Sequence, residues 1–185
     1  MTPQHLPTFI PAELCQAVGV SVQTAGTDPL GWSVKCLEMA RADVNEDGVA
    51  APSADVAGLK DVIAKAHAKN IDLKVVALPN NPWIDTPLRD IATEIGKDHP
   101  DSTVLVISPS YAGTYSATFD RVTLEAGQDV AKTGNSVLSA NNFVNEIGRE
   151  HFSWTALTIV LVLLVAAVCA GITLVRGRFT NDSVK

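Results

Sequence analysis

The uncharged run WTALTIVLVLLVAAVCAGITLV, residues 154–175, constrains this chain more than any other stretch. As an α-helix it would be about 33 Å long at ~1.5 Å per residue, which is enough to cross the apolar core of a bilayer. Trp154 suits a membrane–water interface, and Arg176 and Arg178 follow the run directly. The sequence therefore predicts one C-terminal transmembrane helix over residues 154–175.

The charges on either side of this run predict its orientation. Residues 176–185 carry three basic groups and one acid, whereas residues 141–153 carry one arginine against two glutamates. The positive-inside rule then places the tail 176–185 in the cytoplasm and the preceding domain outside it, at the cell membrane. The N-terminus has neither the basic nor the apolar region of a secretory signal peptide. A tail-anchored protein with a cytoplasmic domain is therefore the alternative.

Residues 1–50 are interpreted as an N-terminal extension that packs on the main domain. Prolines and glycines interrupt its short apolar pieces, and it holds two of the three cysteines, Cys15 and Cys36. If this segment lies outside the cytoplasm, the pair is free to form a disulfide, and two buried free thiols are the alternative.

Residues 51–150 carry the pattern of a small α/β domain. The runs LKVVALP (73–79) and STVLVIS (102–108) predict buried strands, and the helix between them makes a βαβ unit with parallel strands. Two strands are too few for a stable sheet, so we expect edge strands from 112–118, where AGTYSAT can turn back as a hairpin, and from 14–23. Helices are predicted before, between and after the strands, at about 53–70, 86–96, 119–133 and 135–147. The expected fold class is α/β, with a short mixed sheet flanked by helices.

A search for catalytic and metal-binding motifs finds only one partial match. Phosphate-binding loops and a nucleophile elbow are absent, and no histidine pairs with another ligand at a metal-site spacing. Asp43, Asn45, Asp47 and Gly48 match the first half of a calcium loop, but Ala54 occupies the twelfth position, where a carboxylate is needed. A polar turn before a helix is the alternative to this calcium site. The net charge of −6 argues against a nucleic-acid partner, because phosphates repel an acidic domain.

Three long strings carry a family resemblance: IDLKVVALPNNPWIDTPLRDIATEIG, TVLVISPSYAGTYS and FDRVTLEAGQDVAKTGN. Residues 55–149 resemble the TPM domain, and these strings resemble a group of single-span membrane proteins of mycolic-acid-bearing actinobacteria. The resemblance implies a small TPM-like α/β sandwich and a role in cell division and cell separation. It also implies a partner, a Rip-type (NlpC-like) peptidoglycan endopeptidase, which is activated when its autoinhibitory helical segment is bound.

The chain departs from the TPM members that are described as phosphatases. Those members use acidic residues and a metal after the second strand, where this chain reads PSYAGTYS, with no acid between Asp101 and Asp120. Without carboxylates a hard cation has no oxygen cluster there. We therefore expect a non-catalytic regulator of a cell-wall hydrolase, with no catalytic residue and no cofactor other than calcium. The alternatives are a metal-dependent phosphatase that uses Asp43, Asp47, Asp85 or Asp90, and an envelope or divisome scaffold.

The loops after the two predicted strands form the candidate partner-binding site. Asn81, Trp83 and Asp85 follow the first strand, and Tyr111 and Tyr115 follow the second. Because the carboxyl ends of parallel strands meet at one edge of a sheet, we expect these five residues to border one groove that binds a partner helix. Tyrosine among small polar residues suits protein recognition. The alternative is a hairpin capped by tyrosine, with Trp83 folded onto the core.

Overall fold

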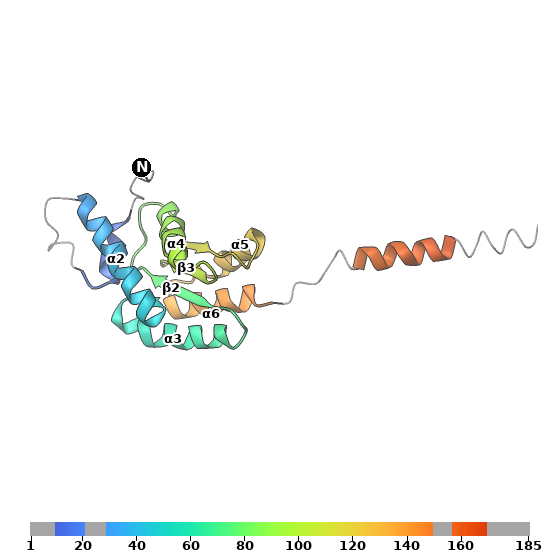
Figure 1. The fold of residues 1–185 in the computed structure, drawn as a ribbon, viewed down its shortest axis with the longest axis horizontal. Coiled ribbons are helices and arrows are strands. Elements are labelled where there is room, and N and C mark those ends of the chain that lie inside the picture. The colour runs from blue at the N-terminus through green and yellow to red at the C-terminus, as the bar shows by residue number, and fades with distance from the viewer. Residues whose placement is uncertain (1–9, 21–28, 150–156, 170–185) are drawn as a thin grey trace, which may run out of the picture. The chain divides into compact units, whose positions relative to one another are not determined.

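The structure is a computed structural model of the 185-residue chain, and it describes residues 10–20, 29–149 and 157–169 (Figure 1). The chain divides into two units, Met1–Arg149 and Glu150–Lys185. In the described part, the first unit contains six helices and four strands. They are α1 (Ala12–Ala17), α2 (Pro29–Asp47), β1 (Val49–Ala50), α3 (Ser53–His67), β2 (Leu73–Ala77), α4 (Thr86–Asp98), β3 (Thr103–Ile107), β4 (Ala112–Tyr115), α5 (Arg121–Val130) and α6 (Ser136–Ile147).

The four strands form one mixed sheet in the order β1-β2-β3-β4. The strand β2 pairs in parallel with both β1 and β3, as a βαβ unit requires. The strand β4 folds back antiparallel to β3, with Ile107 opposite Ala112 and Val104 opposite Tyr115. This part of the predicted fold, a small α/β domain with a short mixed sheet, agrees with the structure.

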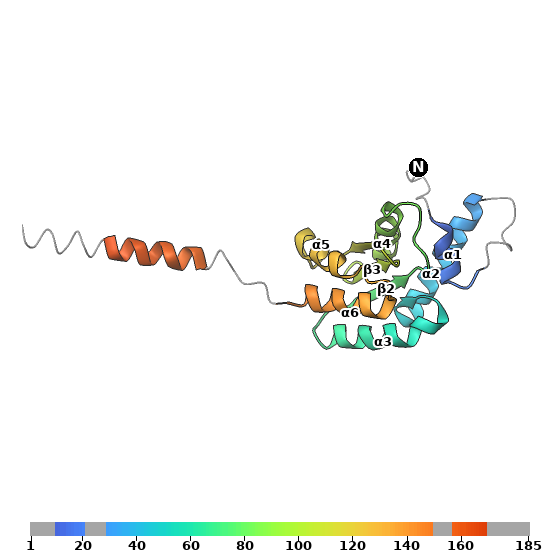
Figure 2. The same cartoon turned by 180° about the vertical axis from the view of Figure 1, so that it is seen from behind.

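The sheet lies between two layers of helices, as Figures 1 and 2 show for α4 on one side and α3 with α6 on the other. Alternate side chains along β3 serve the two layers: Leu105 and Ile107 join the core under α3, α5 and α6, whereas Val104 and Val106 join the core under α1, α2 and α4. This alternation follows from the two-residue repeat of a strand. Both faces of the sheet are therefore buried, which explains why its central strands are continuously apolar.

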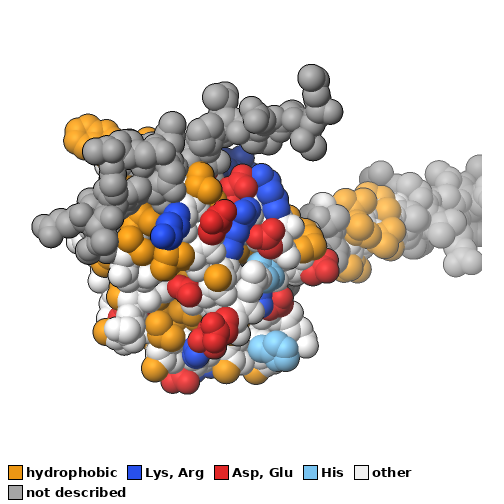
Figure 3. Space-filling view, turned by 60° about the vertical axis from the view of Figure 1, so that its left-hand side comes forward, with side chains coloured by type: hydrophobic (Ala, Val, Ile, Leu, Met, Phe, Trp, Pro, Cys, Tyr) orange, Lys and Arg blue, Asp and Glu red, His pale blue; other side chains and the backbone are white. Residues whose placement is uncertain are grey.

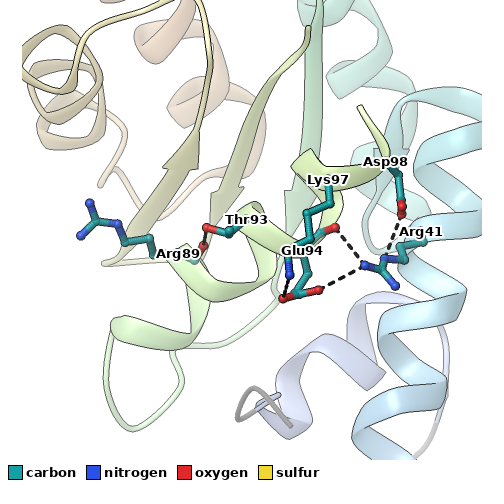
Figure 4. Close-up of polar contacts among 6 residues, drawn as sticks. All are labelled: Arg41, Arg89, Thr93, Glu94, Lys97 and Asp98. Carbon is teal, nitrogen blue, oxygen red and sulfur yellow. Dashed lines mark hydrogen bonds and ion pairs between the residues drawn. The ribbon is translucent and has the colours of Figure 1, made fainter. Parts of the chain in front are cut away.

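The helix α2 is held on α4 by Arg41 (Figure 4). Arg41 Nη2 donates hydrogen bonds to the backbone oxygen of Glu94 at 2.9 Å and to Glu94 Oε2 at 3.3 Å. Arg41 Nε also lies 3.0 Å from Asp98 Oδ2 in an ion pair. Because Arg41 and Glu94 are partly buried, these contacts are screened less than surface ion pairs and fix the position of α2.

The described part of the second unit is a helix over 157–169. At ~1.5 Å per residue this helix is about 20 Å long, shorter than the roughly 30 Å of a bilayer core. No helix in the described ranges has the length and apolar character needed to cross a membrane. The predicted transmembrane helix over 154–175 is therefore wrong for the structure as described. Residues 154–156 and 170–175, and the predicted tail 176–185, lie outside the described residues.

The structure joins Cys15 of α1 to Cys36 of α2 in a disulfide, one of the two states that the sequence leaves open. Both side chains are buried, at 2% and 1% exposure, in the core between α1, α2 and α4. The bond closes a loop across a sequence separation of 21 residues. It therefore ties the short helix α1, which is too short to be stable alone, to the rest of the domain.

Removal of this disulfide is expected to destabilise the domain. In the chain-entropy view, a cross-link over a loop of this length contributes about 3 kcal/mol by restricting the unfolded chain. We expect the double variant Cys15→Ser/Cys36→Ser to lose about this much free energy of unfolding in urea titrations followed by circular dichroism. The variant Cys169→Ser is the control, because that exposed cysteine is unpaired. A wild-type protein whose unfolding midpoint does not respond to reductant would contradict this prediction.

Candidate partner-binding site

Asn81 connects the two loops that leave the sheet at the carboxyl ends of β2 and β3. Its Oδ1 accepts hydrogen bonds from Ser110 N at 2.8 Å and from Ser108 Oγ at 2.9 Å. Its Nδ2 donates to Ser110 Oγ at 3.1 Å. The two loops therefore meet at one edge of the sheet, and Asn81 holds the segment that follows β2 in place.

Trp83 lies two residues further on, with 93% of its surface exposed. Ile84 next to it is 47% exposed, whereas Pro82 before it is buried. Trp83 is not folded onto the core. A large aromatic side chain that stands free on an anchored loop is unusual for a residue type that is mostly buried in folded proteins.

The side chains of the two tyrosines are not exposed as that of Trp83 is, and only Tyr111 lies in a loop at this edge. Tyr111 and Tyr115 are partly buried and pack against the core under α1, α2 and α4. Tyr115 pairs with Val104 at the start of β3, which is the opposite end of the sheet from the loop that holds Asn81. Its ring lies against Gly96 of α4, where a Cβ atom would collide with it. The structure therefore does not bring the five predicted residues to one groove, because antiparallel β4 carries Tyr115 away.

A groove does exist beside β4, between α4 and α5, and we name it the α4–α5 groove. Its volume is about 430 Å³, and two of the predicted residues, Asp85 and Tyr115, line it. Gln128 Nε2 of α5 donates a 2.6 Å hydrogen bond to Thr114 Oγ1 of β4 at its wall. The groove has both polar and apolar parts, and charged residues from its two sides line it: Asp85 and Arg89 at the start of α4, and Arg121 and Glu125 on α5.

A second cavity, of about 280 Å³, lies at the carboxyl ends of the parallel strands. Of the described residues that line it, Asp55 alone is acidic, and its neighbours include Ser108 and Asn135. Within the described ranges there is no group of three or more His, Cys, Asp or Glu side chains that could hold a metal ion.

The calcium-like half loop is helical. Asp43, Asn45 and Asp47 lie in the last turns of α2, and the chain turns only at Gly48, where φ is +78°. Burial raises the pKa of Asp43, and the negative charges of Glu46 and Asp47 raise it further. Asp47 pairs instead with Lys60 at 2.6 Å. These residues do not fit a calcium loop, whose ligands come from a turn that wraps the ion.

The surface charges are mixed. Figure 3 shows acidic and basic side chains side by side on one face of the molecule. Ion pairs also join neighbouring charges along the chain, for example Arg121 with Glu125 at 2.5 Å and Lys132 with Asp129 at 2.9 Å. Such pairs at exposed positions contribute little to stability. The excess negative charge of the chain is therefore spread over the surface.

The fold and the groove define a small α/β protein with a recessed surface at the edge of its sheet. Comparison with known proteins shows that its relatives are described as membrane proteins. The chain belongs to the family described as membrane protein Rv1476, which matches residues 1–184. The membrane protein Rv1476 of Mycobacterium tuberculosis is 54% identical over 145 residues, which cover 77% of this chain and 78% of that protein. No solved structure matches the chain.

Sequence reasoning missed several residues of the α4–α5 groove. Arg89 and Gln128 belong to amphipathic helices and look like ordinary solvent-facing positions in the sequence. Their proximity depends on β4, because the first turn of α4 and one face of α5 both lie beside this strand. One signal was present: Asp85 and Arg89 are four residues apart, a spacing that places both on one face of a helix.

Proposed function

We propose that this protein is a non-catalytic, membrane-associated regulator that binds and activates an NlpC-type (Rip-like) peptidoglycan endopeptidase in cell separation. The resemblance to the TPM group supplies the partner, and the membrane family supplies the setting. The observation that carries the proposal is Trp83, which is 93% exposed on a loop pinned by Asn81.

Trp83 has the properties of an anchor for another protein. Tryptophan is enriched among the residues that dominate binding energy, because it buries a large rigid surface at a small entropic cost. Asn81 orders the loop before binding, so little further entropy is lost when a partner covers Trp83. The autoinhibitory helical segment of the endopeptidase is the proposed partner, with its apolar face packed on Trp83 and Ile84. Capture of that segment frees the active site of the enzyme.

The disulfide supports a place for the domain outside the cytoplasm. Disulfides persist in oxidising compartments and are rare in the cytosol. The Cys15–Cys36 bond therefore favours an extracytoplasmic domain, in the compartment where a peptidoglycan hydrolase works. Association with the membrane would concentrate the regulator in the thin space that it shares with the enzyme.

The test is activation of the autoinhibited endopeptidase precursor by the full-length protein in detergent micelles, with release of peptidoglycan fragments as the measurement. We expect a dose-dependent rise in cleavage with the wild type. Trp83→Ala is expected to weaken binding by about thirtyfold or more, the usual loss when an interface anchor is truncated. Leu138→Ala is the control, because it truncates another exposed apolar side chain, on α6.

Three other outcomes would change the proposal. Binding of the precursor without a rise in cleavage would make the protein a scaffold. Unchanged binding by Trp83→Ala would remove Trp83 as the anchor. Absence of any binding by the wild type would overturn the regulatory function.

A further inference from the structure

The strand β4 is an edge strand with unused backbone groups. Within the described residues it pairs on one side only, with β3. The hairpin closes with a hydrogen bond from Ser108 N to the carbonyl oxygen of Tyr111 at 2.9 Å. Because bonded and non-bonded pairs alternate along an antiparallel ladder, Gly113 then bonds to β3, whereas Ala112 and Thr114 direct their N–H and C=O groups outward. These two residues line the α4–α5 groove.

The free edge is recessed, and this limits what can pair with it. The backbone of α4 lies directly against Gly113 on one face of the sheet, and Gln128 of α5 binds Thr114 on the other face. The helices α4 and α5 flank the edge of β4, and the groove of about 430 Å³ lies between them. One extended peptide segment suits such a groove. A second copy of this protein does not, because its own edge is equally recessed and the two strands would not meet.

Arg89 indicates which charge the segment bound in the groove carries. Its side chain points away from the network in which Arg41 binds Glu94 and Asp98 (Figure 4). At the opposite rim of the groove, Arg121 is neutralised by Glu125. In the described part of the chain, no acidic side chain forms an ion pair with Arg89. A guanidinium group in this state is suited to a carboxylate, which it binds through charge-assisted hydrogen bonds.

We propose that the α4–α5 groove binds an extended, acid-bearing segment of the endopeptidase as a fifth strand beside β4, with an Asp or Glu side chain of that segment paired to Arg89. The identity of the partner in this inference rests on the proposed function, whereas the mode of binding is argued from β4, the groove and Arg89. Backbone bonds to Ala112 and Thr114 supply affinity, and Arg89 supplies selectivity, as in other cases of strand addition. Asp85 lines the groove two residues after Trp83, so a segment that packs on Trp83 can continue into the groove.

The experiment measures hydrogen exchange of individual backbone amides by NMR, with the full-length protein in micelles and the endopeptidase precursor as the probe. Binding is expected to slow exchange at Ala112 and Thr114 by about tenfold or more, because their amides gain partners. Arg89→Glu is expected to weaken binding by about tenfold or more, since it replaces an attraction with a repulsion. Arg89 is exposed, so this variant tests the inference without disturbing the core.

Ala112→Pro is the backbone test, and Ala112→Ser is its control. Proline removes the outward N–H of Ala112 and is tolerated on edge strands, whereas serine keeps that N–H. We expect about tenfold weaker binding for the proline variant and unchanged binding for the serine variant.

The outcomes separate this inference from the proposed function. If the precursor binds but the amides of Ala112 and Thr114 exchange at the same rate as before, binding by strand addition is overturned. The proposed regulatory function is then unaffected. If Arg89→Glu and Ala112→Pro both bind the precursor as tightly as the wild type does, the α4–α5 groove is not the binding site. If the wild type does not bind the precursor, the proposed function fails, and this assignment of the occupant fails with it.

Discussion

Gly113→Ala is expected to lower the free energy of unfolding by about 3 kcal/mol, at the upper end of the usual cost of overpacking. A Cβ atom on Gly113 would lie 2.5 Å from the carbonyl carbon of Leu88 and 2.9 Å from Cα of Arg89. Both are backbone atoms of α4, so no rotamer change relieves the contact. The helix must move away from β4, which also opens the α4–α5 groove. Urea unfolding followed by circular dichroism measures the stability loss.

The matched control is Gly134→Ala. Gly134 has φ of +80°, but nothing lies within 4 Å of an added Cβ. That variant therefore carries only the conformational cost of a left-handed residue, about 1–2 kcal/mol. If Gly113→Ala were no more destabilising than Gly134→Ala, α4 would not contact β4 as closely as the structure shows.

Phe143→Ala is expected to cost about 4 kcal/mol, because it leaves a cavity in the core under α3, α5 and α6. Phe143 of α6 is 0% exposed. Gly127 of α5 lies against it, and a Cβ atom on Gly127 would be 2.7 Å from Phe143 Cδ2 and 2.8 Å from Ile147 Cγ2. The ring therefore sets how closely α5 approaches α6. Without the ring, α5 loses its main support, and the side of the groove that carries Gln128 loses its position.

Phe143→Leu separates the loss of volume from the loss of the aromatic ring. Leucine refills most of the space, so we expect a loss of about 1 kcal/mol. Thermal unfolding compares the two variants, and the larger loss should appear as the larger fall in Tm. If Phe143→Ala lowered Tm as little as Phe143→Leu does, the core would have collapsed around the smaller side chain.

The helices and central strands could be predicted because their signals are local. Pro87 stands in the first turn of α4, Asp120 Oδ1 accepts from Thr123 N at 2.8 Å to cap α5, and Asn135 Oδ1 accepts from Leu138 N at 2.8 Å to cap α6. The strands β2 and β3 coincide with the two continuous apolar runs. Each signal depends on neighbours within one or two turns, which a sequence displays directly.

The N-terminal region was misread where a local pattern competed with packing. The Asn/Asp/Gly pattern at 43–48 reads as a turn, yet residues Pro29–Asp47 form the helix α2. Contacts from other parts of the chain decide this, including Arg41 with Glu94 and Cys36 with Cys15. The strand β1, Val49–Ala50, is only two residues long and exists because β2 lies beside it. Of the segment 14–23, considered as a strand, residues 14–17 belong to the helix α1 instead, and residues 21–23 lie outside the described residues.

The amino-acid sequence by itself determined the α/β class, the βαβ unit and the positions of α3, α4, α5 and α6, because caps, periodicity and apolar runs act between near neighbours. It also carried the family resemblance on which the proposed partner rests. Only the tertiary structure decided that the side chain of Trp83 is exposed to solvent while that of Tyr115 packs on α4. It also decided that Arg89 and Gln128 line the same groove. The reason is that β4 reverses the chain along β3. The helices α4 and α5 then pack against β4, with Gly113 against the backbone of α4 and Thr114 bonded to Gln128. This packing brings together side chains that lie far apart in the sequence, and no local pattern records their contact.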